Sequence, residues 1–575
     1  MASFSKEARI IDEVREKSAE FESAQSGYLS EIGEFADHYR IKKLPRKSGA
    51  FSNPRSTEFY RASNALSTMM YRMMTAQDNY FSPIPVQMDA DYGALYRIQS
   101  ALLAQDRAAD YKRNLYRACS FVVPFGTVIC QEDYRSFGVS TFGRRIPATA
   151  MVPRAIDQVM FDLGTTDIKN ADWVSTADIV SNADLMRMKS DASLVGSPWN
   201  TEALDAATAL SEDSTTINPY VLMRLQRSGI NDDTMARKKR ELLMYYGKLD
   251  TLNDGIEYVC ALVNRKILVR FHANNFQHGM RPFRVAKWQD FDGPLGLGLG
   301  NIIGSLQKSI DGNFQRITDN LAMASYNMWE REKNSVLDDD LVIQPLNIVD
   351  SEKIGSIRPL PVETKGAEAS MTLMEIQKQE ARAASGATDT LQAIITNATA
   401  SETSLAMNEA MRNVSVKTEL AAEGLMREHL EAAHANNAQF LNEPLNIASS
   451  MGPMWVYPAE LRFDVDFQLK ITTDKDFRPQ RLDKLINTLQ ILVSTKSQHP
   501  DQMAISILPI VKQIAQMLDV NPDEVVTGAA GMAPGMIPTI GGPQDIMGMS
   551  QMTAPGMGGA DIVSTPVGPT LASPQ

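Results

Sequence analysis

Residues 281–334 read RPFRVAKWQDFDGPLGLGLGNIIGSLQKSIDGNFQRITDNLAMASYNMWEREKN and pass from an extended segment through a glycine loop into a helical pattern. Apolar side chains recur in the second half at spacings of three and four: Ile303, Leu306, Ile310, Phe314, Ile317 and Leu321. This period is that of one face of a helix. The segment therefore predicts a flexible glycine loop that leads into one long helix.

Downstream of this helix, a short β-like module lies between two further helical segments. Residues 338–363 form the module and contain three prolines. A second helix is predicted from about 367 to 384, and a polar loop of small residues follows it. A third helix is predicted over about 402–438, with Ser401 as its N-cap. The centre of the chain thus has the order helix, β module, helix, loop, helix.

Upstream, the first part of the chain predicts several helices. The first forty residues carry the pattern of an amphipathic helix or helix pair, and residues 56–83 predict a helix stopped at Pro83. The helical period continues from Tyr92 to Tyr116. The helix over 56–83 has a stripe of apolar side chains, which we interpret as core: Phe59, Leu66, Met69, Met70, Met73 and Met74.

The stretch between about 120 and 291 mixes the two kinds of pattern. Strands are predicted at residues 120–135, with Gly126 at a bend, at 151–162 and as a pair over 256–272 that turns at Asn264-Arg265. Helices or helix starts are predicted over 176–188 and 230–246. Together with the helices, these patterns predict an α+β protein that is predominantly helical.

After the third helix, residues 454–474 predict one or two strands, and residues 478–496 and 500–520 predict a pair of helices. Beyond about Thr527 the sequence is rich in Gly, Met and Pro and has no period that could build a core. We expect this tail to be disordered, or to be ordered only by a partner.

Charge and cysteine content limit the classes of function. The chain has 57 basic and 69 acidic residues and a net charge of −12, which argues against a protein that reads DNA sequence through a basic surface. The negative charge remains compatible with a channel whose acidic wall lets DNA slide through without binding its phosphates. The three cysteines, Cys119, Cys130 and Cys260, are far apart and fit buried thiols better than a disulfide framework or a zinc site. No membrane span or secretory signal is expected, so we expect synthesis in the cytoplasm.

Catalytic and cofactor motifs are not found, and neither enzymatic activity nor a cofactor is expected. There is no G-x-x-x-x-G-K-[ST] for ATP, and Gly296, Gly298 and Gly300 lack the third glycine spacing of a dinucleotide site. His429 and His434 are five residues apart, which places them on different faces of a helix. The carboxylates at 338–340 are expected to meet solvent rather than a metal ion.

Four stretches share their order and local motifs with one known family. Residues 61–83 end in an aromatic pair, 116–134 centre on a Gly-Thr, 283–315 place a Lys-Trp before a glycine turn, and 396–413 begin a helix with Thr-Ala-x-Glu. In the order and the local motifs of these four stretches, residues 55–440 resemble the portal, or head-to-tail connector, proteins of short-tailed bacteriophages. Leu295-Gly296 stands where the family usually has Tyr-Gly, so the alignment around this loop is inexact.

The resemblance implies a portal architecture of wing, stem, clip and crown. Its expected parts are an N-terminal wing (1–296), a first stem helix (297–335), a clip (336–366), a second stem helix (367–384), a tunnel loop (385–400), a further wing segment (401–470), crown helices (471–527) and a flexible tail (528–575).

The same resemblance implies two sets of contact residues. Polar side chains of the tunnel loop would face the channel without a strong cationic hold on DNA: Ser385, Thr388, Asp389, Asn397 and Thr399. Three cations of the clip would contact DNA phosphates or acidic surfaces of the packaging motor: Lys353, Arg358 and Lys365.

A portal protein would form a homo-oligomeric ring of about twelve subunits at one capsid vertex of the virion. Its expected partners are double-stranded DNA in the channel, the terminase large subunit, a tail adaptor, and the major capsid and scaffold proteins. Two alternatives remain at this point. One is another virion structural protein, such as a collar or adaptor, and the other is a multidomain enzyme whose active site leaves no sequence motif.

Overall fold

The computed structural model describes residues 2–43, 53–86, 92–138, 145–190, 199–209, 239–325, 329–331, 357–359, 365–386, 413–449 and 452–471. The chain divides into two compact units, Met1–Asp476 and Phe477–Gln575, and every described residue belongs to the first. Helices and antiparallel sheets are mixed in this unit, which confirms the α+β class. The predictions for 478–496, 500–520 and the tail after 527 lie outside the described residues.

The N-terminal helix pair is present as predicted, as α1 (Ala2–Ala24) and α2 (Ser26–Tyr39). The next helix, α3 (Glu58–Met74), buries its predicted apolar stripe in the main core. The helix ends at Met74, so the prediction that it runs to Pro83 is wrong. Pro83 lies instead in β1 (Phe81–Pro85), a strand of a two-stranded sheet, where a residue without an N–H is tolerated.

The helical pattern after Tyr92 forms two helices, α4 (Tyr92–Ala108) and α5 (Tyr111–Phe125). Residues 120–125, predicted as strand, are the end of α5. That prediction is wrong because Val122 and Val123 are fully buried, and a continuous apolar run does not distinguish a buried helix from a strand. Gly126, at φ +82, ends the helix and leads into β2 (Thr127–Gly138).

A three-stranded sheet places β2 between β3 (Arg145–Arg154) and β9 (Phe283–Lys287). A five-stranded sheet follows the chain order β4-β5-β6-β7-β8. Its strands are β4 (Val159–Phe161), β5 (Trp173–Ser181), β6 (Lys239–Lys248), β7 (Glu257–Val263) and β8 (Ile267–Ala273). The predicted strand pair over 256–272 is confirmed, and Asn264 and Arg265 form its turn with φ 50 and φ 55. The single strand predicted at 151–162 is instead the end of β3 and the strand β4, separated by a 3-10 turn at Ile156–Gln158.

Two helix predictions in this region are affected by the five-stranded sheet. The prediction over 176–188 is correct from residue 182, where helix α6 (Asn182–Ser190) begins, and wrong for residues 176–181, which belong to β5. The prediction over 230–246 is wrong for residues 239–246, which form most of β6, the central strand, and its first part, 230–238, lies outside the described residues. Buried residues of β6 join both the main core and a second cluster that includes α6 and α7 (Thr201–Thr208), so the strand lacks the alternation of a half-exposed strand.

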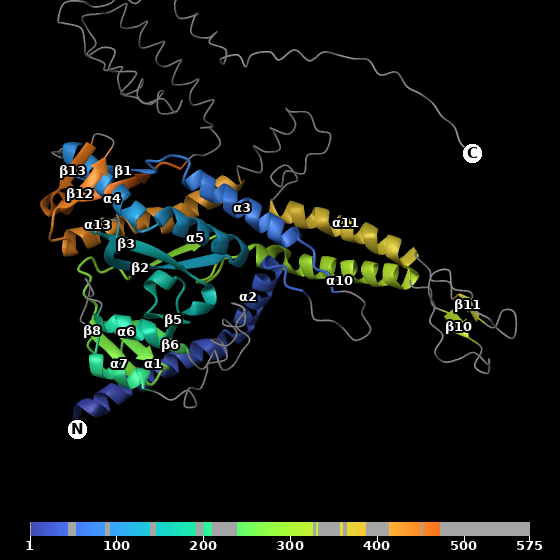
Figure 1. Ribbon diagram of the computed structural model, residues 1–575, viewed down its shortest axis with the longest axis horizontal. Helices are drawn as coiled ribbons and strands as arrows, with labels where there is room; N and C mark the ends of the chain where they lie inside the picture. The colour runs from blue at the N-terminus through green and yellow to red at the C-terminus, as the bar shows by residue number, and fades with distance from the viewer. Residues whose placement is uncertain are drawn as a thin grey trace, which may run out of the picture. The chain divides into compact units, whose positions relative to one another are not determined.

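The central helices are α10 (Leu299–Ser325) and α11 (Lys365–Ser385), which lie side by side (Figure 1). This agrees with the predicted first and second long helices. The first is shorter than the segment 297–335, because α10 ends at Ser325 and β10 (Trp329–Arg331) follows. β10 pairs antiparallel with β11 (Ile357–Pro359), which precedes α11.

The predicted third helix is helical from residue 413, passes through a π-helical turn, η4 (Glu423–Arg427), and continues as α13 (Glu428–Phe440). Its predicted start at 401–412 lies outside the described residues. The strands predicted at 454–474 are present as β13 (Gly452–Val456), paired with β12 (Leu445–Ser449), and β14 (Val465–Leu469), paired with β1.

Candidate functional site

The start of α10 is fixed by a close crossing of two backbone segments. A Cβ atom on Gly298 would lie 2.2 Å from the backbone nitrogen of Gly126. The crossing is tied by hydrogen bonds from the Trp288 N–H to the Gly126 carbonyl (2.8 Å) and from the Gly296 N–H to Thr127 Oγ1 (2.8 Å). The glycines lead into a helix, as predicted, but they serve close packing of two backbone segments rather than the flexibility expected from the sequence.

Polar side chains of α10 cap the N-terminus of α3. Asp311 Oδ1 accepts a hydrogen bond from the Ser56 N–H (2.7 Å), and Gln307 Oε1 accepts one from the Phe59 N–H (3.1 Å). Thr57, the N-cap of α3, provides no side-chain cap of its own. The first turn of α3 thus obtains its hydrogen-bond partners from α10, which orients the two helices relative to each other.

The second helix of the pair is attached to α3 as well. Arg382 of α11 donates to both carboxylate oxygens of Glu58, at 3.1 and 3.2 Å. Between α10 and α11, Asn313 donates to Gln377 (3.0 Å), and Gln377 donates to Ser309 (2.8 Å). Glu58 at the start of α3 therefore anchors one end of the helical hairpin formed by α10 and α11.

Toward its other end, the hairpin exposes large apolar side chains. Leu321 is 47% exposed and Ile376 is 56% exposed, and Met371 and Leu373 of α11 are exposed as well. Leu373 and Ile376 are three residues apart and share a face of α11. An apolar stripe on a long helix is typical of a surface that packs against another molecule.

Two of the three predicted clip cations belong to elements at the far end of this hairpin. Arg358 lies in β11 opposite Glu330 of β10, and Lys365 is the first residue of α11 rather than part of the β module. Lys353 lies outside the described residues.

Ser385, predicted to open the tunnel loop, is instead the last residue of α11. Its side chain is buried and donates a hydrogen bond to the Arg382 carbonyl (3.0 Å). Gly386 follows at φ +71, a conformation that ends helices and favours glycine. The other predicted loop residues, Thr388, Asp389, Asn397 and Thr399, lie outside the described residues.

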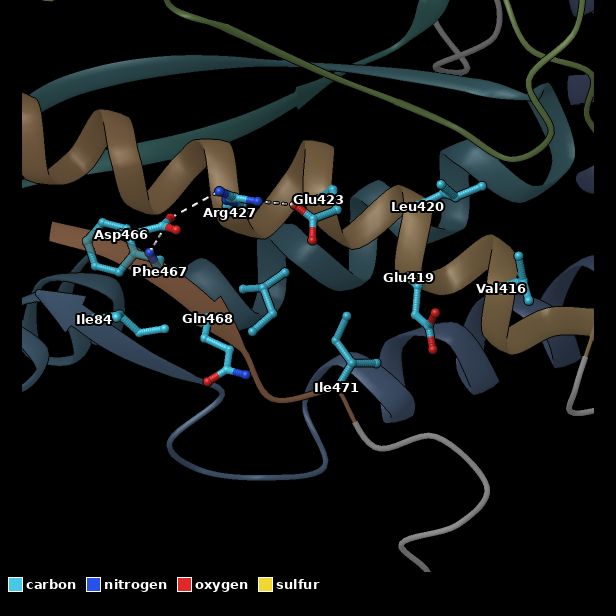
Figure 2. Close-up of a pocket in the computed structure, with 11 residues that line it drawn as sticks. Ile84, Val416, Glu419, Leu420, Glu423, Arg427, Asp466, Phe467, Gln468 and Ile471 are labelled. Carbon is cyan, nitrogen blue, oxygen red and sulfur yellow. Dashed lines mark hydrogen bonds and ion pairs between the residues drawn. The ribbon is translucent and has the colours of Figure 1, made fainter. Parts of the chain in front are cut away.

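A groove of 660 Å³ lies between the helical residues 416–427 and β14 (Figure 2). Val416 and Leu420 are 55% and 65% exposed and line one wall, and Ile84 of β1 lies near the strand wall. Carboxylates stand at its edge, and Arg427 pairs with Glu423 (3.3 Å) and with Asp466 (3.0 Å). With exposed apolar side chains along one wall and charged side chains at its edge, the groove offers a surface for contact with another molecule.

One buried polar cluster was not predicted from the sequence. His429 of α13 is 0% exposed, and its ring nitrogens face Glu132 of β2 and Asp106 of α4. His434 is buried too and contacts the Phe463 carbonyl at 2.8 Å through Nε2. The partners of His429 lie about three hundred residues away in sequence, so no local motif could have identified the cluster.

The thiols of the chain are buried, and the carboxylates at 338–340 lie outside the described residues. Cys119, Cys130 and Cys260 are free and buried, as predicted, and burial raises the pKa of Cys119 and of Cys260 to about 12. Within the described stretches, no group of His, Cys, Asp or Glu side chains is placed to hold a metal ion. Over the same stretches, no helix is both long and apolar enough to cross a bilayer.

The long hairpin with its exposed apolar side chains and the open groove offer surfaces for contact with other molecules. A family model described as phage SU10 portal protein matches residues 143–552, more than half of the chain. The chain belongs to this family of phage portal proteins, which confirms the resemblance inferred from the sequence. The family is structural rather than enzymatic. A search of curated proteins finds no match.

Proposed function

We propose that this protein assembles into a closed ring of about twelve subunits at one vertex of the capsid. Double-stranded DNA passes through the axial channel of this ring during packaging and ejection. The subunit has no enzymatic activity in this role, and the energy for packaging comes from a separate ATPase, the terminase large subunit. The family match and the order of the central elements support this proposal.

The observation that carries it is the hairpin of α10 and α11 with the β10–β11 pair at the joined ends of the two helices. This order supports an arrangement of stem, clip and stem. In the proposed architecture, α10 and α11 are the stem helices and the segment between them, with β10 and β11, is the clip. The tunnel loop follows α11 up to residue 400, so the bounds expected from the sequence, 297–335, 336–366, 367–384 and 385–400, shift accordingly. Residues 1–296 and 401–470 form the wing, 471–527 the crown and 528–575 a flexible tail.

Ring closure requires a different surface on each flank of the subunit, because neighbouring copies meet head to tail. We assign the exposed stripe of α11, Leu373 and Ile376, to one of these surfaces. In a single chain the stripe meets water, whereas in a ring every copy would bury it.

The remaining partners follow from the same arrangement. The clip, with Lys353, Arg358 and Lys365, would dock the terminase motor and later the tail adaptor, and it would contact DNA phosphates. The wing would contact the major capsid and scaffold proteins. Polar tunnel-loop side chains, together with an acidic chain of net charge −12, would let DNA slide without a strong hold on its phosphates.

Native mass spectrometry of the purified chain, combined with negative-stain imaging, tests this proposal. We expect particles of about twelve copies with an axial hole. A compact dimer or tetramer without a hole would contradict it. If only monomers are seen, the measurement is repeated with the scaffold protein present, and a chain that still forms no ring contradicts the proposal as well.

A further inference from the structure

The ring of His429 is held between two carboxylates inside the protein. Its Nδ1 lies 2.9 Å from Glu132 Oε1, and its Nε2 lies 3.4 Å from Asp106 Oδ1. The side chain is 0% exposed, while those of Glu132 and Asp106 are 3% and 6% exposed. Both ring nitrogens therefore face acceptors with little access to water.

This geometry determines the charge of the imidazole. A neutral imidazole has one N–H, and its other nitrogen carries a lone pair that cannot donate. With both nitrogens directed at carboxylate oxygens, a neutral ring would set one lone pair against a buried negative charge. Only the imidazolium, with two N–H groups, satisfies Glu132 and Asp106 together.

A charged imidazole also balances the charges of the side chains around it. Arg284 of β9 pairs with Glu132 at 2.8 Å. If His429 were neutral, the two carboxylates of the cluster would have the positive charge of Arg284 alone. The hydroxyl of Tyr80 donates to Asp106, and the ring of Tyr111 stacks on the imidazole with centroids 4.7 Å apart. Burial raises the pKa of both tyrosines well above the ordinary value, so they remain neutral. The imidazolium supplies the second positive charge.

The cluster joins five elements at one point. His429 comes from α13, Glu132 from β2, Asp106 from α4, Arg284 from β9 and Tyr111 from α5. One turn before His429, the π-helical turn η4 brings Gly424 against the Val285 carbonyl, where a Cβ atom would lie 2.2 Å from the oxygen. The cluster and this contact together set the position of α13 along its axis.

We propose that His429 is a charged positioning residue that holds α13 on the rest of the unit, and that folding of residues Met1–Asp476 takes up one proton at this site. Loss of that proton leaves a net negative charge in the interior and loosens α13 from α4 and β2. This inference is independent of ring formation.

The direction of the pH dependence follows from linkage. Hydrogen bonds and the charges of Glu132 and Asp106 outweigh burial and raise the pKa of His429 from its ordinary 6.5 to about 9. A group whose pKa is raised on folding stabilises fully below its unfolded value, and this contribution is lost as pH rises through the folded value. Stability should therefore fall between pH 6.5 and about 9.

The test is urea unfolding of the full chain, followed by tryptophan fluorescence at fixed protein concentration across this pH range. For the wild type, we expect His429 to lower the folding equilibrium constant by up to about tenfold per pH unit. The variant His429→Gln should lose this slope. The control His434→Gln should keep it, because burial lowers the pKa of His434, so the contribution of His434 to stability changes only below its unfolded pKa and outside this pH range. Equal slopes for wild type and His429→Gln would overturn the proposal.

A second variant covers the case in which His429→Gln does not fold. Asp106→Asn keeps the shape of the side chain but removes one of the two charges that stabilise the imidazolium. We expect the pH range of stability loss to move to lower pH, and hydrogen exchange in residues 428–440 to increase at lower pH than in the wild type, after correction for the intrinsic rate. An unchanged pH range would refute a charged His429.

Discussion

The start of α10 depends on close contacts between the backbone of Gly298 and the backbone of residues 125 and 126. At Gly298, an added Cβ would meet the Gly126 nitrogen at 2.2 Å and the Phe125 carbonyl carbon at 2.7 Å, and neither backbone atom can move independently of β2. Sequence reasoning placed a glycine loop here, but it could not say that two separate glycines meet. The requirement for glycine at this crossing is steric and comes from the tertiary structure.

We therefore expect Gly298→Ala to destabilise the protein by more than about 3 kcal/mol, since the crossing must open to admit the methyl group. Gly27→Ala is the matched control. Gly27 lies in the first turn of α2, and an added Cβ there meets no atom within 4 Å. Chemical unfolding of both variants measures the difference. Equal free energies of unfolding for the two variants would show that the backbone crossing accommodates a methyl group without loss of stability.

A second residue-scale prediction concerns Arg265, whose guanidinium bridges α1 and the five-stranded sheet. It donates to Glu22 (2.6 Å) and to Glu241 (3.0 Å), and the three side chains are between 9% and 15% exposed. Arg265→Ala removes the guanidinium that pairs with both partly buried carboxylates, and we expect a loss of about 2 kcal/mol. Arg15→Ala, which removes an exposed pair with Asp12, should change unfolding by less than about 0.5 kcal/mol. Similar losses of unfolding free energy in Arg265→Ala and Arg15→Ala would contradict this interpretation.

At the scale of elements, the predictions succeeded where the sequence carries a visible period or a turn signal. The helix pair at the N-terminus, α10 and α11 have the period of a helix with one exposed face. The hairpin of β7 and β8 is marked by its turn residues, although β7 is buried on both faces. The predictions failed where an element is buried on both sides and no such signal marks it. Val122 and Val123 of α5 belong to an apolar run like that of a buried strand. β6 lies between two apolar clusters, so its sequence does not alternate between apolar and polar residues. In both cases tertiary burial, rather than local propensity, determined the sequence.

The candidate site shows the same limit. The order of helix, β module and helix was predicted from the sequence, because it depends on local pattern alone. The capping of α3 by Asp311 and Gln307, and the cluster around His429, depend on partners that are hundreds of residues apart. Such contacts have no spacing rule, so they required the structure.

The exposed stripe of α11 gives a prediction at this scale. We expect Leu373→Asp together with Ile376→Asp to prevent ring assembly, because two carboxylates would be buried at the contact between subunits. The fold of the single chain should persist, since both side chains are exposed in it. Native mass spectrometry gives the assembly state, and unfolding gives the stability of the chain.

Gln379→Glu is the control for that experiment, because it adds charge at another exposed position of α11. This variant should form rings like the wild type. Rings that survive the double aspartate variant would show that this stripe lies outside the subunit interface, while the rest of the ring proposal would still stand.

At the scale of the whole molecule, the net negative charge of the chain contrasts with a local group of cations near β11. The chain carries a net charge of −12, and a ring multiplies this value by the number of subunits. An acidic assembly repels DNA phosphates at long range, so attraction must come from local groups of cations. Arg358 and Lys365 flank the junction between β11 and α11, and Lys353 precedes β11 in sequence. Repeated around a ring, these side chains would form a belt of positive charge at the end of the stem.

This belt leads to the last prediction. We expect the triple variant Lys353→Glu, Arg358→Glu and Lys365→Glu to form rings but to lose DNA packaging or motor docking, because the belt becomes acidic. The control reverses three exposed cations elsewhere: Lys42, Lys112 and Arg187. It changes net charge equally, so it separates a local effect at the clip from a general effect of charge. Packaging assays at low and high salt show whether the effect is electrostatic, since an electrostatic contact weakens as salt increases. If the triple variant packages DNA and docks the adaptor as well as the control does, the clip contacts its partners through other residues.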